Sequence, residues 1–219
     1  MAMYPKGAYK WDIILHNAKY LFYQKGIAAT TIREIAELSG DPTSLVHYYF
    51  KKKEDIIQEI YHDFLGKIDL FVYSNVFSDE EELTVLLAHS VTQFIYYDII
   101  LNDPKNLQVY TESLVKSSNQ SILNQYIDHV YRKIADELDV NISEDYFQAI
   151  VSMDFGSRRD LLQKYRNGEI KLTTLEVCRL LIKTFPLQLG LSQEHMDAIL
   201  EKAQCFFEQM DYSHLKFLV

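Results

Sequence analysis

Apolar residues recur with a helical period along most of this 219-residue chain. The first periodic set predicts a helix over about residues 9–25, which ends at Gly26. A second set predicts a long helix from residue 53 to about residue 71. Beyond Ser74 the periodic stretches continue, without the alternation of apolar and polar residues that is typical of strands.

Short segments rich in Ser, Asn, Asp, Gly and Pro divide the chain beyond residue 74 into further helices. These breaks fall at residues 78–79, 102–104, 117–119, 141–143, 167–168 and 190–192. Ser78 and Ser143 are the expected N-caps, and Pro186 should end or kink the helix in which it lies. The apolar stripes between the breaks supply the buried faces of a bundle, so we expect an all-α fold.

The stretch that begins at Thr30 predicts two short helices separated by a tight turn. Thr30 or Thr31 can cap the first helix, and Glu34 follows Thr31 at the spacing of a capping box. Gly40 can take the positive φ that a turn at a helix end requires, and Pro42 suits the start of the next helix because it lacks a backbone N–H. The second helix can then pack its apolar side chains inward and present its polar side chains outward.

The two short helices carry a recognisable set of residues, namely Thr31, Ile35, Ala36, Gly40, the run His47-Tyr48-Tyr49-Phe50, and Lys53-Glu54. In identity and spacing this set resembles the helix-turn-helix of the tetracycline-repressor (TetR) family. The resemblance implies a three-helix DNA-binding domain over residues 1–53, a connecting helix over residues 54–72, and a larger C-terminal helical bundle over residues 73–219 for effector binding and dimerisation. It also implies a homodimer, usually a repressor, that binds a palindromic or pseudo-palindromic double-stranded DNA operator.

Two positions depart from the family pattern. Many relatives carry a tyrosine where this chain has His47, and a small flexible pair of residues where it has Asp41-Pro42. The base contacts of relatives therefore cannot be transferred directly to this chain.

By the same resemblance, six residues are expected to contact DNA: Thr31, Thr43, Ser44, His47, Tyr48 and Lys53. Thr31 and Lys53 would bind phosphates, whereas residues of the second short helix would reach base edges. The alternative for Lys53 is a solvated lysine, because it is one of three in a row. Residues 1–7 are expected to form a nonhelical arm, which either touches DNA or is disordered.

The distribution of charge supports a nucleic-acid partner although the formal net charge is −9. Residues 1–53 contain eight Lys and Arg against four Asp and Glu, whereas residues 54–219 contain fourteen against twenty-seven. Phosphate binding needs only a local positive surface, so the basic N-terminal segment is sufficient.

The C-terminal segment offers two candidate sites. By resemblance, a small apolar or aromatic effector would bind among aromatic residues with polar tips, although such a stripe can equally be plain core. The candidates are Phe94, Tyr97, Tyr110, Tyr126, Tyr131, Phe147, Phe155 and Tyr165, with Met153 among them. The last two helices would pair with a second copy, or their apolar residues would seal the chain's own core. The dimerisation candidates are Leu175, Cys178, Leu181, Ile182, Phe185, Met196, Ile199, Ala203 and Phe206.

Other kinds of site are not indicated. The seven histidines show no metal-ligand spacing, and neither a nucleophile motif nor a phosphate-binding glycine loop is present, so we expect no enzyme, no cofactor and no metal. Cys178 and Cys205 are interpreted as small hydrophobic residues. Arg158 and Arg159 either bind an anion or form an ion-paired surface. No apolar run long enough for a membrane span is found, so we expect a cytoplasmic protein with no membrane partner.

The preferred hypothesis is a homodimeric, DNA-binding repressor that an effector releases from its operator. An alternative keeps the DNA-binding domain but gives the C-terminal domain a protein partner and no small effector. A small helical enzyme that carries the motif by chance would instead show a polar cleft with perturbed ionisable groups and no basic face.

Overall fold

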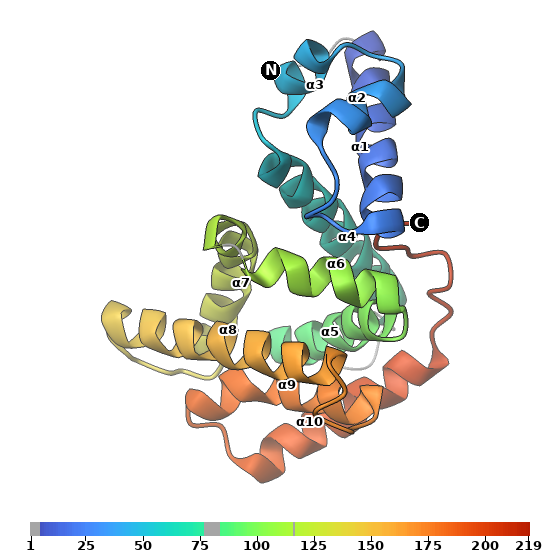
Figure 1. Ribbon diagram of the computed structural model, residues 1–219. Helices are drawn as coiled ribbons and strands as arrows, with labels where there is room; N and C mark the ends of the chain where they lie inside the picture. Colours follow the sequence, from blue (N-terminus) through green and yellow to red (C-terminus); the bar gives the residue numbers. More distant parts are fainter. Residues whose placement is uncertain (1–4, 77–83, 116) are drawn as a thin grey trace.

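The computed structural model describes residues 5–76, 84–115 and 117–219, which form ten α-helices and no strand (Figure 1). The helices are α1 Pro5–Lys25, α2 Ile32–Ser39, α3 Thr43–Tyr49, α4 Lys53–Val76, α5 Val85–Leu101, α6 Pro104–Val115, α7 Ser117–Glu137, α8 Glu144–Arg166, α9 Thr174–Gln188 and α10 Gln193–Gln209. The expected all-α fold, with an N-terminal helix-turn-helix, is confirmed.

The first three helices form a compact N-terminal unit. Ile14 and Ala18 of α1, Ile35 of α2 and Val46 of α3 are each completely buried and belong to one apolar core. Helix α1 begins at Pro5, so the expectation that residues 5–7 are nonhelical is wrong. The physical reason is that a proline at the first helical position loses no hydrogen bond.

Helix α4 joins this unit to the remaining helices. Its buried face consists of apolar residues at helical spacing, including Ile56, Ile60, Phe64 and Ile68, none of which is more than 2% exposed. Because α4 packs against both α1 and α5, a displacement at one end of α4 can be transmitted to the other.

Helix α5 is the centre of the C-terminal helices. Fourteen of its 17 residues are buried, and α4, α6, α7, α9 and α10 all pack against it (Figure 1). An N-cap at Thr84 starts α5, with its hydroxyl oxygen accepting a hydrogen bond from the Leu87 N–H at 3.1 Å. The expected cap at Ser78 lies outside the described residues.

The breaks between the later helices follow the sequence pattern. Helix α6 begins at Pro104, Ser143 caps α8, and Ser192 caps α10. Pro186 lies inside α9, which continues to Gln188, so the expected end of the helix comes two residues after the proline rather than at it.

The segment after α10 returns to the junction between the N-terminal unit and α4 (Figure 1). The Phe217 ring is completely buried, with its centroid 5.1 Å from that of Tyr61 and 5.2 Å from that of Phe64, both on α4. Tyr212 donates a hydrogen bond from its hydroxyl to Asp98 of α5 at 2.8 Å. The segment therefore ties α4 to the central helix.

Candidate nucleic-acid interface

Helix α2 starts with the predicted capping box. The Thr31 hydroxyl oxygen accepts a hydrogen bond from the Glu34 N–H at 3.2 Å, and the Glu34 carboxylate accepts one from the Thr31 N–H at 2.9 Å. The Lys25 ammonium and the Thr31 groups lower the pKa of Glu34 to about 2, so this carboxylate stays ionised at neutral pH. The Thr31 side chain is exposed but bound to Glu34, and its contact with a phosphate stays a prediction.

The turn between α2 and α3 has the geometry that the sequence predicts. Gly40 has φ 65°, and the Asp41 N–H donates to the Ala36 carbonyl at 3.0 Å, which closes the helix end. The Asp41 carboxylate binds the Lys10 ammonium of α1 at 2.7 Å. One of the two departures from the family pattern therefore supplies an anchor between this turn and α1.

Helix α3 packs one face against the N-terminal core and exposes the other. Val46 is completely buried and Phe50 is 4% exposed, with the Phe50 ring 5.9 Å from that of Trp11. On the opposite face, Ser44, His47 and Tyr48 are exposed, and Tyr48 is 78% exposed. Their spacing of three and four residues places them side by side on one helical surface. Thr43, the first residue of α3, is partly buried.

His47 is oriented by the backbone that follows α3. Its Nδ1 lies 3.3 Å from the Lys51 carbonyl oxygen, which can only accept a hydrogen bond. Nδ1 must therefore carry the proton in this contact, and the neutral ring presents Nε2 as an acceptor. In the major groove such an acceptor matches the exocyclic amino group of cytosine or adenine.

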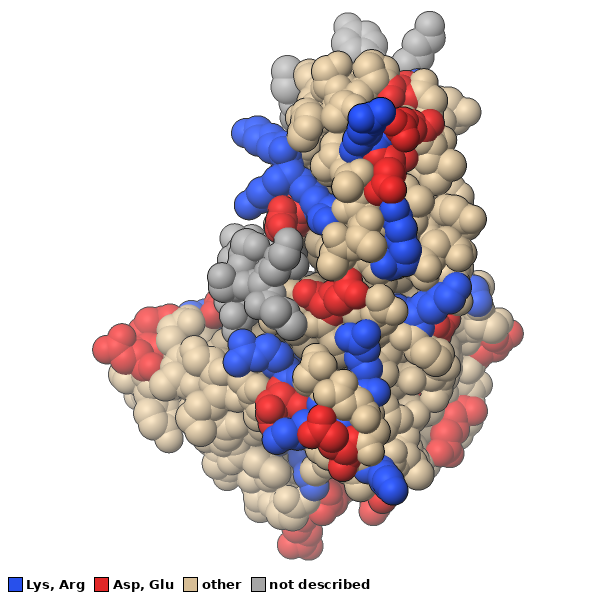
Figure 2. All heavy atoms as spheres, viewed as in Figure 1, with Lys and Arg blue, Asp and Glu red and all other residues tan. Residues whose placement is uncertain are grey.

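The lysines after α3 differ in their surroundings. Lys51 and Lys52 are exposed, and Figure 2 shows Lys and Arg side chains projecting beside this turn. The Lys53 ammonium instead donates hydrogen bonds to the Ile27 and Thr30 carbonyl oxygens, each at 2.6 Å. Lys53 thus fixes the loop before α2 to the start of α4, while its predicted phosphate contact stays a prediction. The sequence pattern did not single out Lys51 and Lys52, although they belong to the same run.

Most of the residues predicted to bind an effector lie in the core of the C-terminal helices. Phe94, Tyr97, Tyr110, Tyr131, Phe147 and Phe155 are buried, Tyr165 is partly buried, and the side chain of Tyr126 lies outside the described residues. Met153, in contrast, is 63% exposed on α8. Among the described residues, three hollows have volumes of about 680, 420 and 240 Å³, and their lining does not include these residues. The six buried aromatic residues belong to the apolar core, and their contact with an effector stays a prediction.

A buried polar cluster lies within this core. Asp154 and Arg158 of α8 form an ion pair at 3.0 Å, with side chains 1% and 4% exposed. The Tyr131 hydroxyl donates to Asp154 at 2.8 Å, and the His89 ring meets the Tyr131 ring edge to face at 5.9 Å. Arg158 is therefore buried rather than part of a surface ion pair, because its partner lies one turn earlier on the inner face of α8.

Two atoms of this cluster, Asp154 Oδ1 and Arg158 Nε, lack a hydrogen-bond partner among the described residues. Burial raises the pKa of Asp154 and lowers that of Arg158. Burial also lowers the pKa of His89 to about 3, with a further contribution from the Arg158 charge, so the imidazole is neutral. His89 lines the 240 Å³ hollow between α4, α5 and α7, which brings this cluster close to solvent. Sequence reasoning missed Asp154 and His89, although the spacing of Asp154 and Arg158 is that of a helical ion pair.

The residues predicted to form a dimer interface are mostly inside the chain. Cys178, Leu181, Ile182, Phe185, Met196 and Ala203 are buried, whereas Leu175, Ile199 and Phe206 are partly exposed. A second copy can contact only side chains that the first copy leaves accessible. The six buried residues pack in the chain's own core, and dimerisation through α9 and α10 stays a prediction.

The described residues hold no cluster of His, Cys, Asp or Glu suited to a metal ion. Within the same ranges, no helix is long and apolar enough to cross a membrane.

Comparison with known proteins agrees with the geometry of the N-terminal unit. Residues 14–60 match the family described as bacterial regulatory proteins, tetR family. The chain is 26% identical over 148 residues to the HTH-type transcriptional repressor KstR2 of Mycolicibacterium smegmatis, covering 60% of this chain and 70% of that protein. It is 27% identical over 120 residues to the probable HTH-type transcriptional regulator YttP of Bacillus subtilis, covering 48% and 58%.

Solved structures share the fold. The fatty acid degradation regulator FadR from Bacillus halodurans superposes with a TM-score of 0.53 at 17% identity, covering 88% of this chain and 99% of that chain. A tetR-family transcriptional regulator from Streptomyces coelicolor superposes with a TM-score of 0.51 at 16% identity, covering 98% and 96%. The relatives are named as regulators, in agreement with the absence of an enzyme motif from the sequence. With its exposed α3 and the matched helix-turn-helix, this chain belongs to the tetR family of bacterial DNA-binding transcriptional regulators.

Proposed function

We propose that this regulator is a homodimeric repressor that a small molecule releases from its operator. In this proposal residues 1–53 bind DNA and residues 73–219 bind the effector and dimerise. Residues 54–72 form the helix that connects these two domains. The observation that carries it is the exposed polar face of α3, which the buried Val46 and Phe50 hold in a fixed orientation. Repression, as opposed to activation, is supported by relatives that are named as repressors, KstR2 of Mycolicibacterium smegmatis among them.

Each copy would place α3 in the major groove, with the two helices about one helical turn of DNA apart. Ser44, His47 and Tyr48 face the bases, and the exposed Lys51 and Lys52 lie where the adjacent phosphates would pass. Thr43 and Thr31, at the starts of the two short helices, would border this contact.

The test of DNA recognition uses His47. An operator is first selected from a random pool of duplexes, and single-base variants are then measured with wild-type protein and with His47→Ala. Because Nε2 accepts from one amino group, the variant should lose about 1–3 kcal/mol of discrimination at one C or A and keep it elsewhere. Tyr49→Phe, a change on the same helix but away from the exposed face, is the control. Unchanged discrimination in His47→Ala would exclude base contact by His47.

The buried polar cluster supports an effector. Asp154 Oδ1 and Arg158 Nε are buried without a hydrogen-bond partner in the part of the chain that the structure describes, and such groups normally bind a water or a ligand. The neighbouring 240 Å³ hollow, which His89 lines, offers a short route from solvent. An effector could direct a polar group at this pair and place a ring against the surrounding tyrosines. Its polar group would then supply hydrogen-bond partners to both atoms.

The second candidate function, a C-terminal domain that binds a protein and no small molecule, is favoured by a different observation. The predicted effector residues pack against one another and against the rest of the core, with the Tyr97 and Tyr110 ring centroids 6.3 Å apart and the Tyr131 ring stacked 3.6 Å from that of Phe185. Mass spectrometry of denatured protein separates the two. If the chain binds an effector, a small molecule should co-purify with the wild type and be absent from Asp154→Asn. If the C-terminal domain binds a protein and no small molecule, neither the wild type nor the variant should contain one.

A further inference from the structure

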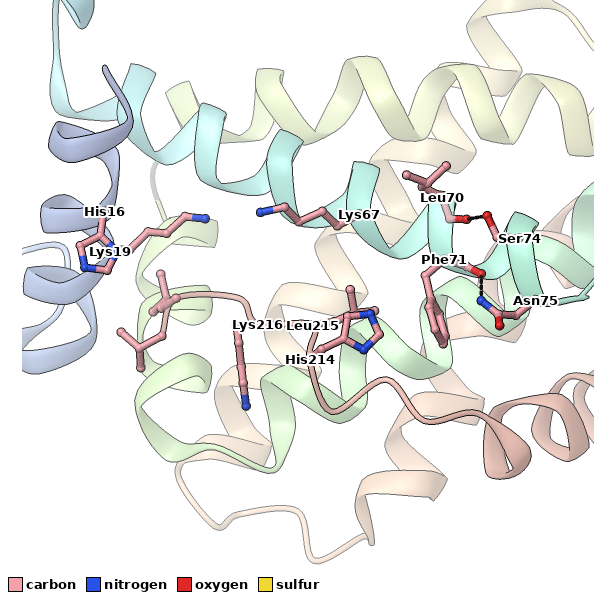
Figure 3. Close-up of a pocket in the computed structure, with 12 residues that line it drawn as sticks. His16, Lys19, Lys67, Leu70, Phe71, Ser74, Asn75, His214, Leu215 and Lys216 are labelled. Carbon is pink, nitrogen blue, oxygen red and sulfur yellow. Dashed lines mark hydrogen bonds between the residues drawn. The ribbon is translucent and has the colours of Figure 1, made fainter. Parts of the chain in front are cut away.

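A hollow of about 680 Å³ lies where the N-terminal unit, the connecting helix and the C-terminal segment meet. Figure 3 shows its walls: His16 and Lys19 come from α1, Lys67 to Asn75 from α4, and His214 to Lys216 from the segment after α10. Its volume is within the range of small-molecule sites, about 300–1,000 Å³. The hollow is separate from the buried polar cluster and shares no lining residue with the 240 Å³ hollow beside His89.

The floor of this hollow is apolar. Leu70 is 70% exposed although it lies on the same helix as a buried apolar stripe, and Phe71 is its neighbour on α4. Leu215 and Leu218 of the C-terminal segment form the opposite wall. The Phe71 ring meets the His214 ring edge to face at 5.3 Å, which fixes the position of that wall. An apolar body of a ligand would cover Leu70 and remove its surface from water.

The rim is positively charged. Among the described residues that line the hollow are Lys19, Lys67 and Lys216, and none of those residues is Asp or Glu. Lys19 and Lys67 point toward one another in Figure 3, and both ammonium groups bind the Asp63 carboxylate, at 2.7 and 2.9 Å. Two cations around one carboxylate leave a net positive charge beside the apolar floor. A ligand with one anionic head and an apolar body complements both features.

An occupant would contact both the N-terminal unit and the segment that is tied to the C-terminal helices. Lys19 belongs to the helix that supports α2 and α3, whereas the C-terminal segment is tied to the central helix α5 by the Tyr212 to Asp98 hydrogen bond. A ligand between them would set the distance between the N-terminal unit and the C-terminal helices. The spacing of the two α3 helices in a dimer depends on that distance.

We propose that this hollow binds an amphipathic monoanion, such as an unbranched carboxylate, and that its occupant changes the affinity for operator DNA. Binding does not depend on the proposed function, whereas the effect on the operator rests on it.

The experiment measures decanoate binding to the full-length protein by isothermal titration calorimetry, without DNA. Lys67→Glu should weaken binding about ten-fold because it reverses a charge at the rim, and Leu70→Glu should weaken it at least as much because it places a carboxylate on the floor. Leu70→Met, which keeps an apolar side chain, should restore binding. Lys171→Glu, at an exposed lysine between α8 and α9, makes the same charge change away from the hollow and should bind as wild type does. Circular dichroism confirms that each variant is folded.

Decyltrimethylammonium, with the same chain and the opposite charge, should bind at least about ten-fold more weakly than decanoate. Equal binding of the two amphiphiles, no binding of decanoate, or unchanged binding in both Lys67→Glu and Leu70→Glu would overturn the proposed site. Operator affinity is then measured with and without decanoate. A change that Leu70→Glu abolishes supports the coupling, and an unchanged affinity in a protein that does bind decanoate and operator overturns it. Failure to bind any operator would contradict the proposed repressor function and leave the calorimetric result intact.

Discussion

His89 shows how burial alone fixes the charge of one residue. The side chain is 8% exposed on the central helix, next to the ring of Tyr131 and near the Arg158 charge. Burial, with a smaller contribution from Arg158, lowers its pKa to about 3 from an ordinary value of 6.5. The imidazole in the core is therefore neutral at pH 7.

This environment makes stability depend on pH with a defined sign. Between pH 6.5 and pH 3 the unfolded chain protonates His89 and the folded chain does not, so the free energy of unfolding decreases as the pH falls through this window. Each pH unit costs about 1.4 kcal/mol, so lowering the pH from 7 to 5 should cost about 2 kcal/mol through this residue. Urea unfolding measures the free energy of unfolding at both pH values. Between pH 7 and pH 5 the His89→Gln variant should lose about 2 kcal/mol less of this free energy than the wild type does. The same substitution at the exposed His62 is the control, and equal losses in His89→Gln and wild type would show that His89 is not held neutral.

Lys53 illustrates what a motif residue does beyond its family role. The resemblance assigned it to a phosphate, and the structure places its ammonium on the Ile27 and Thr30 carbonyl oxygens. A lysine at this position thus closes the end of the loop that precedes α2. The spacing of a motif identifies the position, but not the backbone atoms that the folded chain brings to it.

At the scale of the element, two glycines end helices in the N-terminal unit with different neighbours. Gly26 after α1 and Gly40 after α2 have φ values of 83° and 65°. A Cβ at Gly40 would meet no atom within 4 Å, whereas a Cβ at Gly26 would lie 2.7 Å from the side-chain ends of Gln108 and Glu112 on α6. Glu112 also accepts a hydrogen bond from the Ala28 N–H at 3.0 Å, so this contact links the loop after α1 to α6.

The two alanine variants should therefore differ. Gly40→Ala should cost only the strain of the left-handed backbone, about 1–2 kcal/mol. Gly26→Ala adds displacement of the α6 side chains and loss of a hydrogen bond, so its cost should exceed that of Gly40→Ala by about 1 kcal/mol. Urea unfolding measures both free energies. Equal costs would mean that Gln108 and Glu112 move aside without loss, and that the α1 to α6 contact contributes little.

The sequence predicts elements best where the cause is local. The Thr31 and Glu34 capping box, the turn at Gly40 and the cap at Ser143 each depend on residues within four positions, and all three are confirmed. Helix α5 is different, because polar residues such as Gln93 are buried with its apolar ones, and no period reveals which five helices enclose it.

The candidate sites also differ in whether their cause is local in the sequence or depends on distant segments. The outward face of α3 follows from its period, since Val46 had to be internal. The hollow beside Leu70 depends on a segment that returns from the far end of the chain, and Phe217 is buried against α4 although about 150 residues separate them. Contacts over such separations leave no pattern in the sequence of either partner.

At the scale of the whole molecule, the proposed homodimer needs a surface on which a second copy can bind. The predicted residues of α9 and α10 are largely buried, but α8 carries Tyr146 at 56% exposure and Met153 at 63% exposure. These two side chains are seven residues apart and lie on one face, with the exposed Ala149 between them. A contiguous apolar patch exposed on a soluble protein is a candidate protein interface. A dimer through α8 would leave the α3 helices of both copies accessible, because α8 lies at the opposite part of the molecule from α3 (Figure 1).

Met153→Glu tests this interface, because it places a carboxylate in the centre of the exposed apolar face, and an unpaired buried charge costs several kcal/mol in an interface. Sedimentation equilibrium should find a dimer for the wild type and a monomer for Met153→Glu at micromolar concentration, and operator affinity should fall because two half-sites are no longer bound together. Ser152→Glu introduces the same charge one residue away, at an exposed position outside the apolar face, and should remain dimeric. A dimeric Met153→Glu would remove α8 from the interface and return the assignment to the partly exposed Leu175, Ile199 and Phe206, where the same charge substitution can be made in turn.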